Sequence, residues 1–275
     1  MRTSPLHATL RYAAIILGGF IMAAPLLFMV SGSLQSAAEV SAFPKPLLPE
    51  TPIWQNFVDA WNFLTPQVIA NTFIFSLGIV GLQLLLSLPA AFALAKIPFK
   101  WSAAVMATLI VPMFIPGNLT LIPLFIVTFQ LGWLNTYAGL IIPMAAQCAF
   151  AILLFRQFFA TMPAGLIEAA RIDGASWGRV LTSIALPLAK PALATFCSIS
   201  FLTAWNMYIW PQVIAPNPAN RVINVALAPL AGGENSVISP AVGLAGAVIS
   251  MLPVLIVFIV FQKWYLKGIA GTGLE

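Results

Sequence analysis

Charged residues are scarce in this chain. Only 7% of its 275 residues are Asp, Glu, Lys or Arg, whereas 61% are hydrophobic. Because a typical soluble domain is about 25% charged, this composition excludes an ordinary soluble domain and an intrinsically disordered chain. A helix that spans a bilayer needs about 20 apolar residues. We therefore expect an all-α, polytopic membrane protein with a single transmembrane domain over 1–275 and room for six spanning helices.

Residues that usually carry catalysis or bind metals are also nearly absent. The chain has 2 cysteines and 1 histidine, and their spacing matches neither a disulfide framework nor a metal site. No Gly-Lys-Ser or Gly-Lys-Thr triplet of a phosphate-binding loop occurs. We therefore expect no enzyme activity, no metal site and no cofactor on this chain.

Stretches without any charged residue define the candidate spans, because a charge at the bilayer centre costs about 2.5–3.5 kcal/mol on insertion scales. The longest stretch, 101–155, is long enough for two spans, and Gly132, Asn135 and Gly139 indicate the turn between them. We predict spanning helices at 10–32, 68–95, 103–130, 137–158, 191–213 and 241–264. The first is longer than the apolar core of a signal peptide, so we expect it to remain in the protein.

The third predicted helix, 103–130, contains Pro112, Pro116, Gly117 and Pro123. Proline removes a backbone donor and disrupts the preceding turn. We expect this helix to be kinked or partly unwound, which a membrane protein tolerates where neighbouring groups or a water-filled cavity satisfy the freed backbone groups.

Basic residues predict the orientation, because cytoplasmic loops carry an excess of Lys and Arg. Six spans place both termini on one side, and that side also holds the loop 159–190. The side with the termini carries Arg2, Arg11, Lys96, Lys100, Arg156, Arg171, Arg179, Lys190, Lys263 and Lys267, and the other side carries only Lys45 and Arg221. We expect both termini to be cytoplasmic, and the net charge of +5 needs no nucleic-acid partner.

The spans carry no ionisable residue at mid-depth, although ion-coupled carriers usually do. A sodium site made of backbone carbonyls stays possible. An active transporter of this composition would take its energy from a partner.

The loop 159–190 has helix signals. Pro163 suits a first turn, Leu166, Ile167 and Ala170 can share a face, and Gly174 can end the helix with a positive φ. The small residues Ala169 and Ala170 would let this helix lie close to another protein.

This loop resembles a known motif. Glu168-Ala169-Ala170, then Gly174, then Ile184, then Leu186-Pro187 match the EAA loop of ABC importer permeases at each defined position. Phe43-Pro44, Trp205-Asn206 and the tail 262–268 resemble the carbohydrate-importer subfamily, which includes the smaller maltose permease protein and the glycerol-3-phosphate permeases. The end of the chain, 273–275, departs from the basic ending of that family.

The resemblance implies a type I ABC importer permease fold in a bacterial or archaeal inner membrane. It further implies that the loop 159–190 couples to a cytoplasmic ATPase, with ATP and magnesium bound by that partner. The implied coupling residues are Glu168, Ala169, Ala170, Arg171, Asp173 and Gly174. The implied partners are a second, different permease subunit, two ATPase copies, an extracytoplasmic substrate-binding protein and membrane lipid.

Uncharged polar and aromatic side chains inside the spans suit a sugar, which binds through amide hydrogen bonds and aromatic stacking. The candidates for a substrate pathway are Asn118, Gln147, Trp205, Asn206 and Tyr208. The expected substrate is a sugar or sugar-like solute, such as an oligosaccharide, an amino sugar or a glycerol phosphate derivative. Two alternatives stay open: a secondary carrier for a small neutral solute, and an ABC permease for a non-carbohydrate solute.

Overall fold

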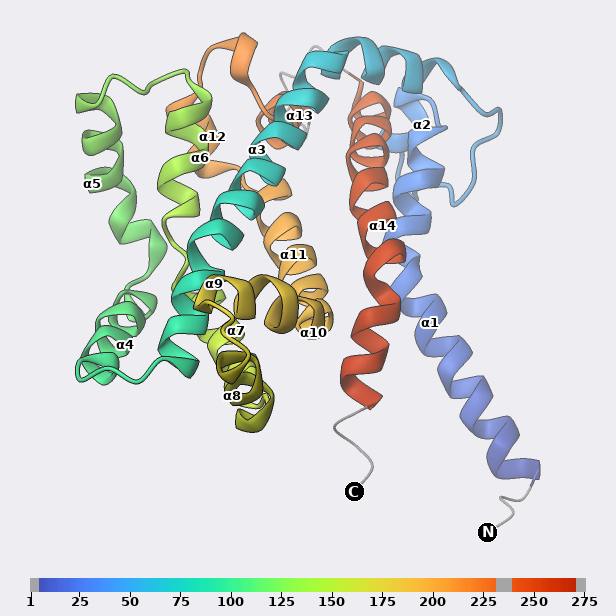
Figure 1. Ribbon diagram of the computed structural model, residues 1–275. Helices are drawn as coiled ribbons and strands as arrows, with labels where there is room; N and C mark the ends of the chain where they lie inside the picture. The colour runs from blue at the N-terminus through green and yellow to red at the C-terminus, as the bar shows by residue number, and fades with distance from the viewer. Residues whose placement is uncertain (1–4, 231–238, 271–275) are drawn as a thin grey trace. The chain divides into compact units, whose positions relative to one another are not determined.

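The computed structural model describes residues 5–230 and 239–270, without the side chains of 5–8 and 263–270. Arg2, Glu234, the end of the chain and the tail side chains after Gln262 therefore lie outside the described residues. The described chain is helical and contains no strand. Its elements are α1 (Pro5–Ser33), α2 (Ala37–Ser41), α3 (Gln55–Lys96), α4 (Ser102–Ile110), η1 (Val111–Phe114), α5 (Gly117–Gln130), α6 (Tyr137–Ala145), α7 (Ala149–Ala160), α8 (Ala164–Ile172), α9 (Trp177–Val180), η2 (Leu181–Ala185), α10 (Leu186–Leu188), α11 (Lys190–Trp205), α12 (Ile209–Ile214), η3 (Pro218–Asn220), α13 (Ile223–Leu227), η4 (Ala228–Leu230) and α14 (Pro240–Ala270) (Figure 1).

The chain forms two compact units. The first comprises residues 1–66 and 226–252, and the second comprises residues 67–225 and 253–275. In the first unit, α1 packs closely against the beginning of α14. A Cβ atom on Gly32 would lie 2.6 Å from Leu244 Cδ1, and one on Gly246 would lie 2.8 Å from Leu227 Cδ2. Small residues at these positions therefore allow close helix packing, as is common between membrane helices.

Side-chain amides order the segment that follows α1. Asn56 Nδ2 donates hydrogen bonds to the carbonyls of Ser33 and Gln35, both at 2.9 Å. Gln35 Nε2 donates to the Pro46 carbonyl at 2.9 Å. Glu39 accepts from the backbone N–H groups of Glu50 and Ser36. These bonds hold the pKa of the Glu39 carboxyl below its ordinary value, and the bond from the Glu50 N–H has the largest effect.

A buried amide ties distant segments together in the second unit. Asn71 is fully buried, and its Nδ2 donates to the Ala219 carbonyl at 2.8 Å and the Arg221 carbonyl at 3.0 Å. Its Oδ1 accepts from Gln67 Nε2 at 2.8 Å and from the Tyr137 hydroxyl at 2.6 Å. Since all four hydrogen-bonding positions of the amide are used, Asn71 joins α3, α6 and η3 without an unpaired buried group.

Two apolar clusters form the core of the second unit. One contains Phe75, Leu140, Trp210 and Ile214, from α3, α6 and α12. The other surrounds Phe155 of α7, with further aromatic and aliphatic residues from α3, α8, α9 and α11. The second cluster therefore lies under the loop that resembles the EAA motif.

The predicted spans agree with the structure in their positions but not in all their details. Three helices have the length and apolarity of a membrane span: 9–33, Gln55–Lys96 and 240–262. Three bent pairs meet the same criterion together: Ser102–Phe114 with Gly117–Gln130 at 102°, Tyr137–Ala145 with Ala149–Ala160 at 46°, and Trp177–Leu188 with Lys190–Trp205 at 79°. Six spans result when each pair counts as one. The predicted break of the third helix is confirmed at Ile115 and Pro116.

Two helices that the sequence predicted as continuous are broken. The predicted helix 137–158 is interrupted at 146–148, where no proline or glycine marks the break. The predicted helix 191–213 ends at Trp205, and α12 begins at Ile209. Pro211 accounts for the second break, because its ring would clash with the carbonyl four residues earlier, at Met207.

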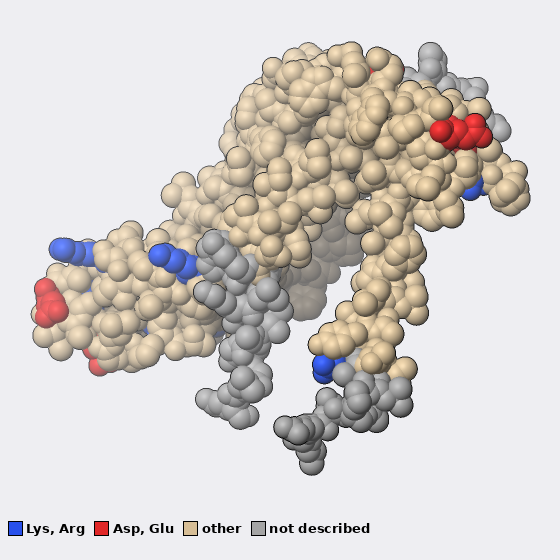
Figure 2. All heavy atoms as spheres, turned by 90° about the vertical axis from the view of Figure 1, so that its right-hand side faces the viewer, with Lys and Arg blue, Asp and Glu red and all other residues tan. Residues whose placement is uncertain are grey.

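Large apolar side chains are exposed along the candidate spans, as expected for a lipid-facing surface. Met22 on α1 is 82% exposed, Ile122 on α5 is 70% exposed and Ile256 on α14 is 61% exposed. Figure 2 shows one face, on which charged side chains are few and most atoms belong to uncharged residues.

The turn between α5 and α6 generates a stability prediction. Gly132 and Asn135 have positive φ angles of 71° and 55°, and a Cβ atom on Gly139 would overlap the Trp133 carbonyl oxygen. We expect Gly139→Ala to destabilise the protein by about 1–3 kcal/mol, because the backbone there must move. Gly19→Ala is the matched control, since a Cβ on that helical glycine meets nothing within 4 Å.

Thermal unfolding of the purified transporter, followed with a dye that reacts with newly exposed thiols, measures the effect. Gly139→Ala lowers the midpoint, whereas Gly19→Ala leaves it unchanged or raises it slightly, because alanine is the better helix former. Equal midpoints for the two variants contradict the close approach at Gly139.

Candidate functional site

Three helix breaks in the second unit meet at one cavity of about 490 Å³. The breaks lie before α5, between α6 and α7, and between α11 and α12. Asn118 follows the first break, Gln147 lies in the second, and Asn206 and Tyr208 lie in the third. Irregular backbone at membrane depth is tolerated where it lines a cavity. The cavity therefore accounts for the position of the three helix breaks.

Four of the five residues predicted for a substrate pathway line this cavity: Asn118, Gln147, Asn206 and Tyr208. Trp205 does not line it. Its side chain is 1% exposed, and its ring contacts Phe73 edge-on at 5.0 Å and stacks on Phe201 at 5.4 Å between centroids. The Trp205 carbonyl also accepts a hydrogen bond from Asn224 Nδ2 at 2.7 Å. Trp205 thus packs in the core directly before the break that exposes Asn206.

The polar ends of the cavity residues are available to a ligand. Within residues 5–230 and 239–270, the side-chain amides of Asn118, Gln147 and Asn206 make no hydrogen bond to another group. The Tyr208 hydroxyl makes none either. All four side chains are exposed in this chain. Among the buried polar side chains of the unit, Asn71 is fully paired, whereas the Ser76 and Ser87 hydroxyls have no partner. The cavity therefore concentrates unused donors and acceptors.

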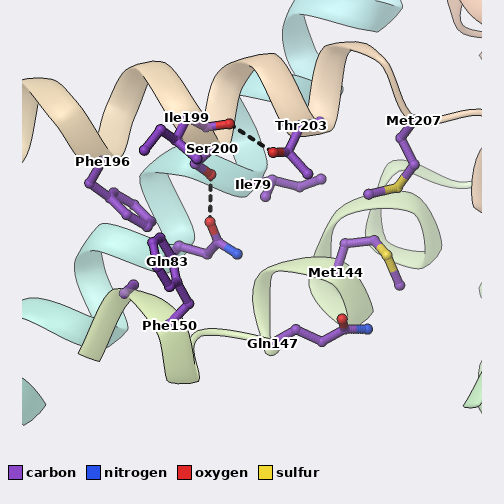
Figure 3. A pocket seen from close by; sticks show the side chains of 12 residues that line it. Ile79, Gln83, Met144, Gln147, Phe150, Phe196, Ile199, Ser200, Thr203 and Met207 are labelled. Carbon is purple, nitrogen blue, oxygen red and sulfur yellow. Dashed lines mark hydrogen bonds between the residues drawn. The ribbon is translucent and has the colours of Figure 1, made fainter. Parts of the chain in front are cut away.

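A second cavity of about 200 Å³ shares three of the same residues, Met144, Gln147 and Met207. It adds Gln83 of α3 and Ser200 of α11 (Figure 3). The Ser200 hydroxyl donates to Gln83 Oε1 at 2.6 Å and so joins the two helices at the cavity wall. The sequence analysis missed Gln83, although a lone amide inside an apolar run signals an internal partner.

No charged side chain lines either cavity. Amides and hydroxyls form hydrogen bonds with uncharged groups in either direction, and Tyr208 and Trp210 offer aromatic surfaces. This lining is suited to a solute rich in hydroxyl groups.

The helix α8 forms as predicted around the EAA motif. It ends at Ile172, and Gly174 has a φ of 81°. The Gly174 N–H donates to the Arg171 carbonyl at 3.1 Å, and the Ala175 N–H donates to the Ala170 carbonyl at 3.0 Å. This pair of bonds is the Schellman arrangement, in which glycine supplies the left-handed residue. The prediction that Gly174 ends the helix is confirmed.

The two faces of α8 differ from the predicted arrangement. Ile167 is 6% exposed and Ala170 packs half-buried against the Phe155 cluster. Leu166 was expected on the same face but is 43% exposed. Ala169 and Ile172 are exposed beside it, with Ile172 at 86%. We call Leu166, Ala169 and Ile172 the α8 ridge.

The charged residues of the motif have separate surroundings. Glu168 is exposed, and Asp173 caps α8 through its backbone N–H, which donates to the Ala169 carbonyl at 3.0 Å. The Arg171 guanidinium lies over the Trp177 ring at 4.6 Å from the centroid, and its Nη1 donates to the Ala175 carbonyl at 2.7 Å. Arg171 therefore fixes α8 against α9.

Comparison with known proteins decides the family. Residues 83–271 match the family described as the binding-protein-dependent transport system inner membrane component. The chain belongs to this family. The match begins at Gln83, the amide of the smaller cavity, and includes the whole of α8.

Two relatives of the permease cover nearly its whole length. It is 29% identical to the sn-glycerol-3-phosphate transport system permease protein UgpE of Rhizobium meliloti (strain 1021), over 98% of each chain. It is 31% identical to the UgpE protein of Pectobacterium atrosepticum, over 95% of each chain. Among solved structures, a chain of a bacterial ABC transporter involved in the import of the acidic polysaccharide alginate superposes with a TM-score of 0.84. The two share 27% identity, and the match covers 96% of this permease and 99% of that chain.

These matches confirm the all-α type I ABC importer permease fold and a multi-pass protein of the inner membrane. They also confirm that the chain is a transport subunit and not an enzyme. The alternative of a secondary carrier is therefore wrong. The family works with an ATPase and a substrate-binding protein.

Gly174 allows a test of the positive φ. Within this chain a Cβ atom there would meet nothing within 4 Å, so strain inside the permease would come from the positive φ, which costs an L-residue roughly 1–2 kcal/mol. We expect Gly174→Val to abolish most uptake while the protein still inserts. Gly174→Asn should keep most of it, because asparagine tolerates this conformation.

Uptake by cells, normalised to the amount of permease in the membrane, measures the difference. The account fails if the valine variant transports as well as the asparagine variant.

Proposed function

We propose that this permease is one of two different permease subunits of an ATP-driven importer for a sugar or sugar-like solute. The observation that carries the proposal is the uncharged cavity, at which three helix breaks expose side-chain amides that bond no other group of the described chain. The same compact unit contains the loop 159–190, so the proposed cargo contacts and ATPase contacts belong to one compact part of the chain.

The chemistry of the cavity favours hydroxyl groups over charges. Asn118, Gln147 and Asn206 each offer a donor and an acceptor, and the lining contains no cation. The relatives are named for sn-glycerol 3-phosphate, and the similar structure for the acidic polysaccharide alginate, both of which are anionic. We propose that this subunit binds the hydroxyl-bearing part of its cargo. For an anionic cargo, the second permease subunit would supply the cation.

The energy is proposed to come from two copies of a cytoplasmic ATPase that bind ATP and magnesium. The α8 ridge would lie in a groove of one ATPase copy, with Glu168 at its rim, while Ile167 and Ala170 hold the helix on the permease. An extracytoplasmic binding protein would deliver the cargo. The basic asymmetry of the sequence supports an orientation with both termini and α8 in the cytoplasm.

The docking role of α8 is tested by filling the ridge. In Ala169→Trp the large side chain should overfill a complementary groove at a cost of about 1–3 kcal/mol, so the ATPase should be lost when the tagged permease is purified. Ala103→Trp is the control, because Ala103 is also exposed, lies on the same predicted side and is not part of the ridge. Full ATPase retention by Ala169→Trp would remove the basis for assigning coupling to α8.

The cavity is tested after its cargo is identified. A thermal-shift screen of the cognate binding protein against sugars, sugar acids, amino sugars and glycerol phosphates supplies the cargo. Gln147→Leu should then raise the KM for uptake about two- to tenfold, because one hydrogen bond contributes about 0.5–1.5 kcal/mol.

Met144→Leu is the control, since it lines the same cavities and conserves volume. An unchanged KM in Gln147→Leu, or a screen in which only non-carbohydrate solutes bind, contradicts the proposed cargo class.

A further inference from the structure

We propose that Lys96 and Arg156 form a reciprocal clamp between α3 and α7 that transmits the movement of the coupling helix to the cavity. The inference rests on the proposed function, because it needs an ATPase that moves α8. The two residues are positioning residues, because neither lines the two cavities described above.

Lys96 is the last residue of α3, and its ammonium group reaches the end of another helix. Its Nζ donates to the Met162 carbonyl at 2.7 Å and lies 3.5 Å from the Ala160 carbonyl. Ala160 ends α7, and Met162 lies directly between α7 and α8. The last carbonyls of a helix lack partners within the helix and attract a cation. Lys96 thus holds the junction of α7 and α8 against α3.

Arg156 makes the same kind of contact in the opposite direction. It lies on α7, and its Nε donates to the Leu94 carbonyl in the last turn of α3 at 3.4 Å. Each helix therefore supplies a cation to the carbonyl end of the other. Within the described residues neither side chain has a carboxylate partner, so these contacts are directional bonds between two backbones.

Buried aromatic rings extend the clamp beneath α8. Phe92, one turn before Lys96, contacts Phe159 edge-on at 5.6 Å and Trp177 at 6.2 Å between centroids. Trp177 also carries the Arg171 guanidinium. Lys96 lines a surface hollow of about 450 Å³ together with Ile167, Glu168 and Ile172 of α8. Packed contacts therefore connect α8 to α3 and α7, so a force on the α8 ridge would be transmitted to both helices.

Both clamped helices run from this contact to the cavity. Gln83 lies 13 residues before Lys96 on α3, which corresponds to about 20 Å along a helix at 1.5 Å per residue. On α7, Phe150 and Ala151 line the smaller cavity, and Ala160 lies at the clamp. The Ser200–Gln83 hydrogen bond then passes movement of α3 to α11. The clamp joins the far ends of two of the helices that line the smaller cavity.

The experiment measures how accessible the larger cavity is to a labelling reagent, and it does not require the cargo to be known. In the assembled transporter, Cys148 and Cys197 are replaced by alanine and Thr120, which lines the larger cavity, is replaced by cysteine. The rate of labelling by a membrane-impermeant maleimide is compared without nucleotide and with ATP plus vanadate. With the clamp intact we expect the rate to change by at least about fivefold, the lower end of typical coupling between sites.

Lys96→Met should abolish this change while the complex keeps its ATPase subunits and still hydrolyses ATP. Lys96→Arg should restore it, because the guanidinium also donates to carbonyls. Lys100→Met is the matched control, since the Lys100 ammonium lies over the Trp101 ring at 5.8 Å and bonds no carbonyl in the described structure.

The outcomes separate the two proposals. A full change in Lys96→Met, loss of the ATPase from that variant, or no rescue by arginine overturns the clamp. No nucleotide effect with the clamp intact overturns the proposed function itself.

Discussion

The cost of leaving a polar group unpaired in hydrocarbon constrains this whole molecule. Long stretches of the chain carry no charge, and the buried amide of Asn71 uses all of its hydrogen-bonding positions. An unpaired amide or backbone group at membrane depth costs several kcal/mol unless water or a ligand reaches it. The unpaired side chains at the cavity are exposed, so water or a ligand can reach them there. The breaks before α5, between α6 and α7, and between α11 and α12 are tolerated for the same reason, since polar backbone at each of them can face the cavity.

The same constraint shapes how the permease could be driven. Since no Asp, Glu, Lys or Arg lines the two cavities, energy would reach them through packed helices. The second unit provides a continuous route: the α8 ridge, the aromatic rings under it, the ends of α3 and α7, and the cavity wall at Gln83. Half-buried cations are well suited to the middle of this route. Lys96 and Arg156 bind backbone carbonyls. The position of a backbone carbonyl is set by the main chain and does not depend on the neighbouring side chains.

Much of this could be predicted from the sequence because its signals are local. Charge-free stretches located the spans, Pro116 marked the largest bend, and the spacing from Glu168 to Gly174 located a helix that ends with a positive φ. The misses are long-range or lack a local marker. No proline or glycine announces the break at Gln147, and burial of Trp205 depends on Phe73, far away in sequence. In the sequence alone, Lys96 only adds to the basic charge of one side of the membrane. Its contact with the end of α7 is visible only in the folded chain.

The most direct test of the central claim, that the proposed coupling helix α8 and the cavity helices move as one body, is a distance within this chain. Spin labels at Ile172→Cys on α8 and Leu85→Cys on α3, without Cys148 and Cys197, report it in the assembled transporter. Both positions are exposed, at 86% and 70%. The account predicts the same distance distribution without nucleotide and with ATP plus vanadate, under conditions in which labelling at Thr120→Cys changes. A shift approaching one helical turn, about 5 Å, would show that α8 moves independently of the cavity and would contradict the account.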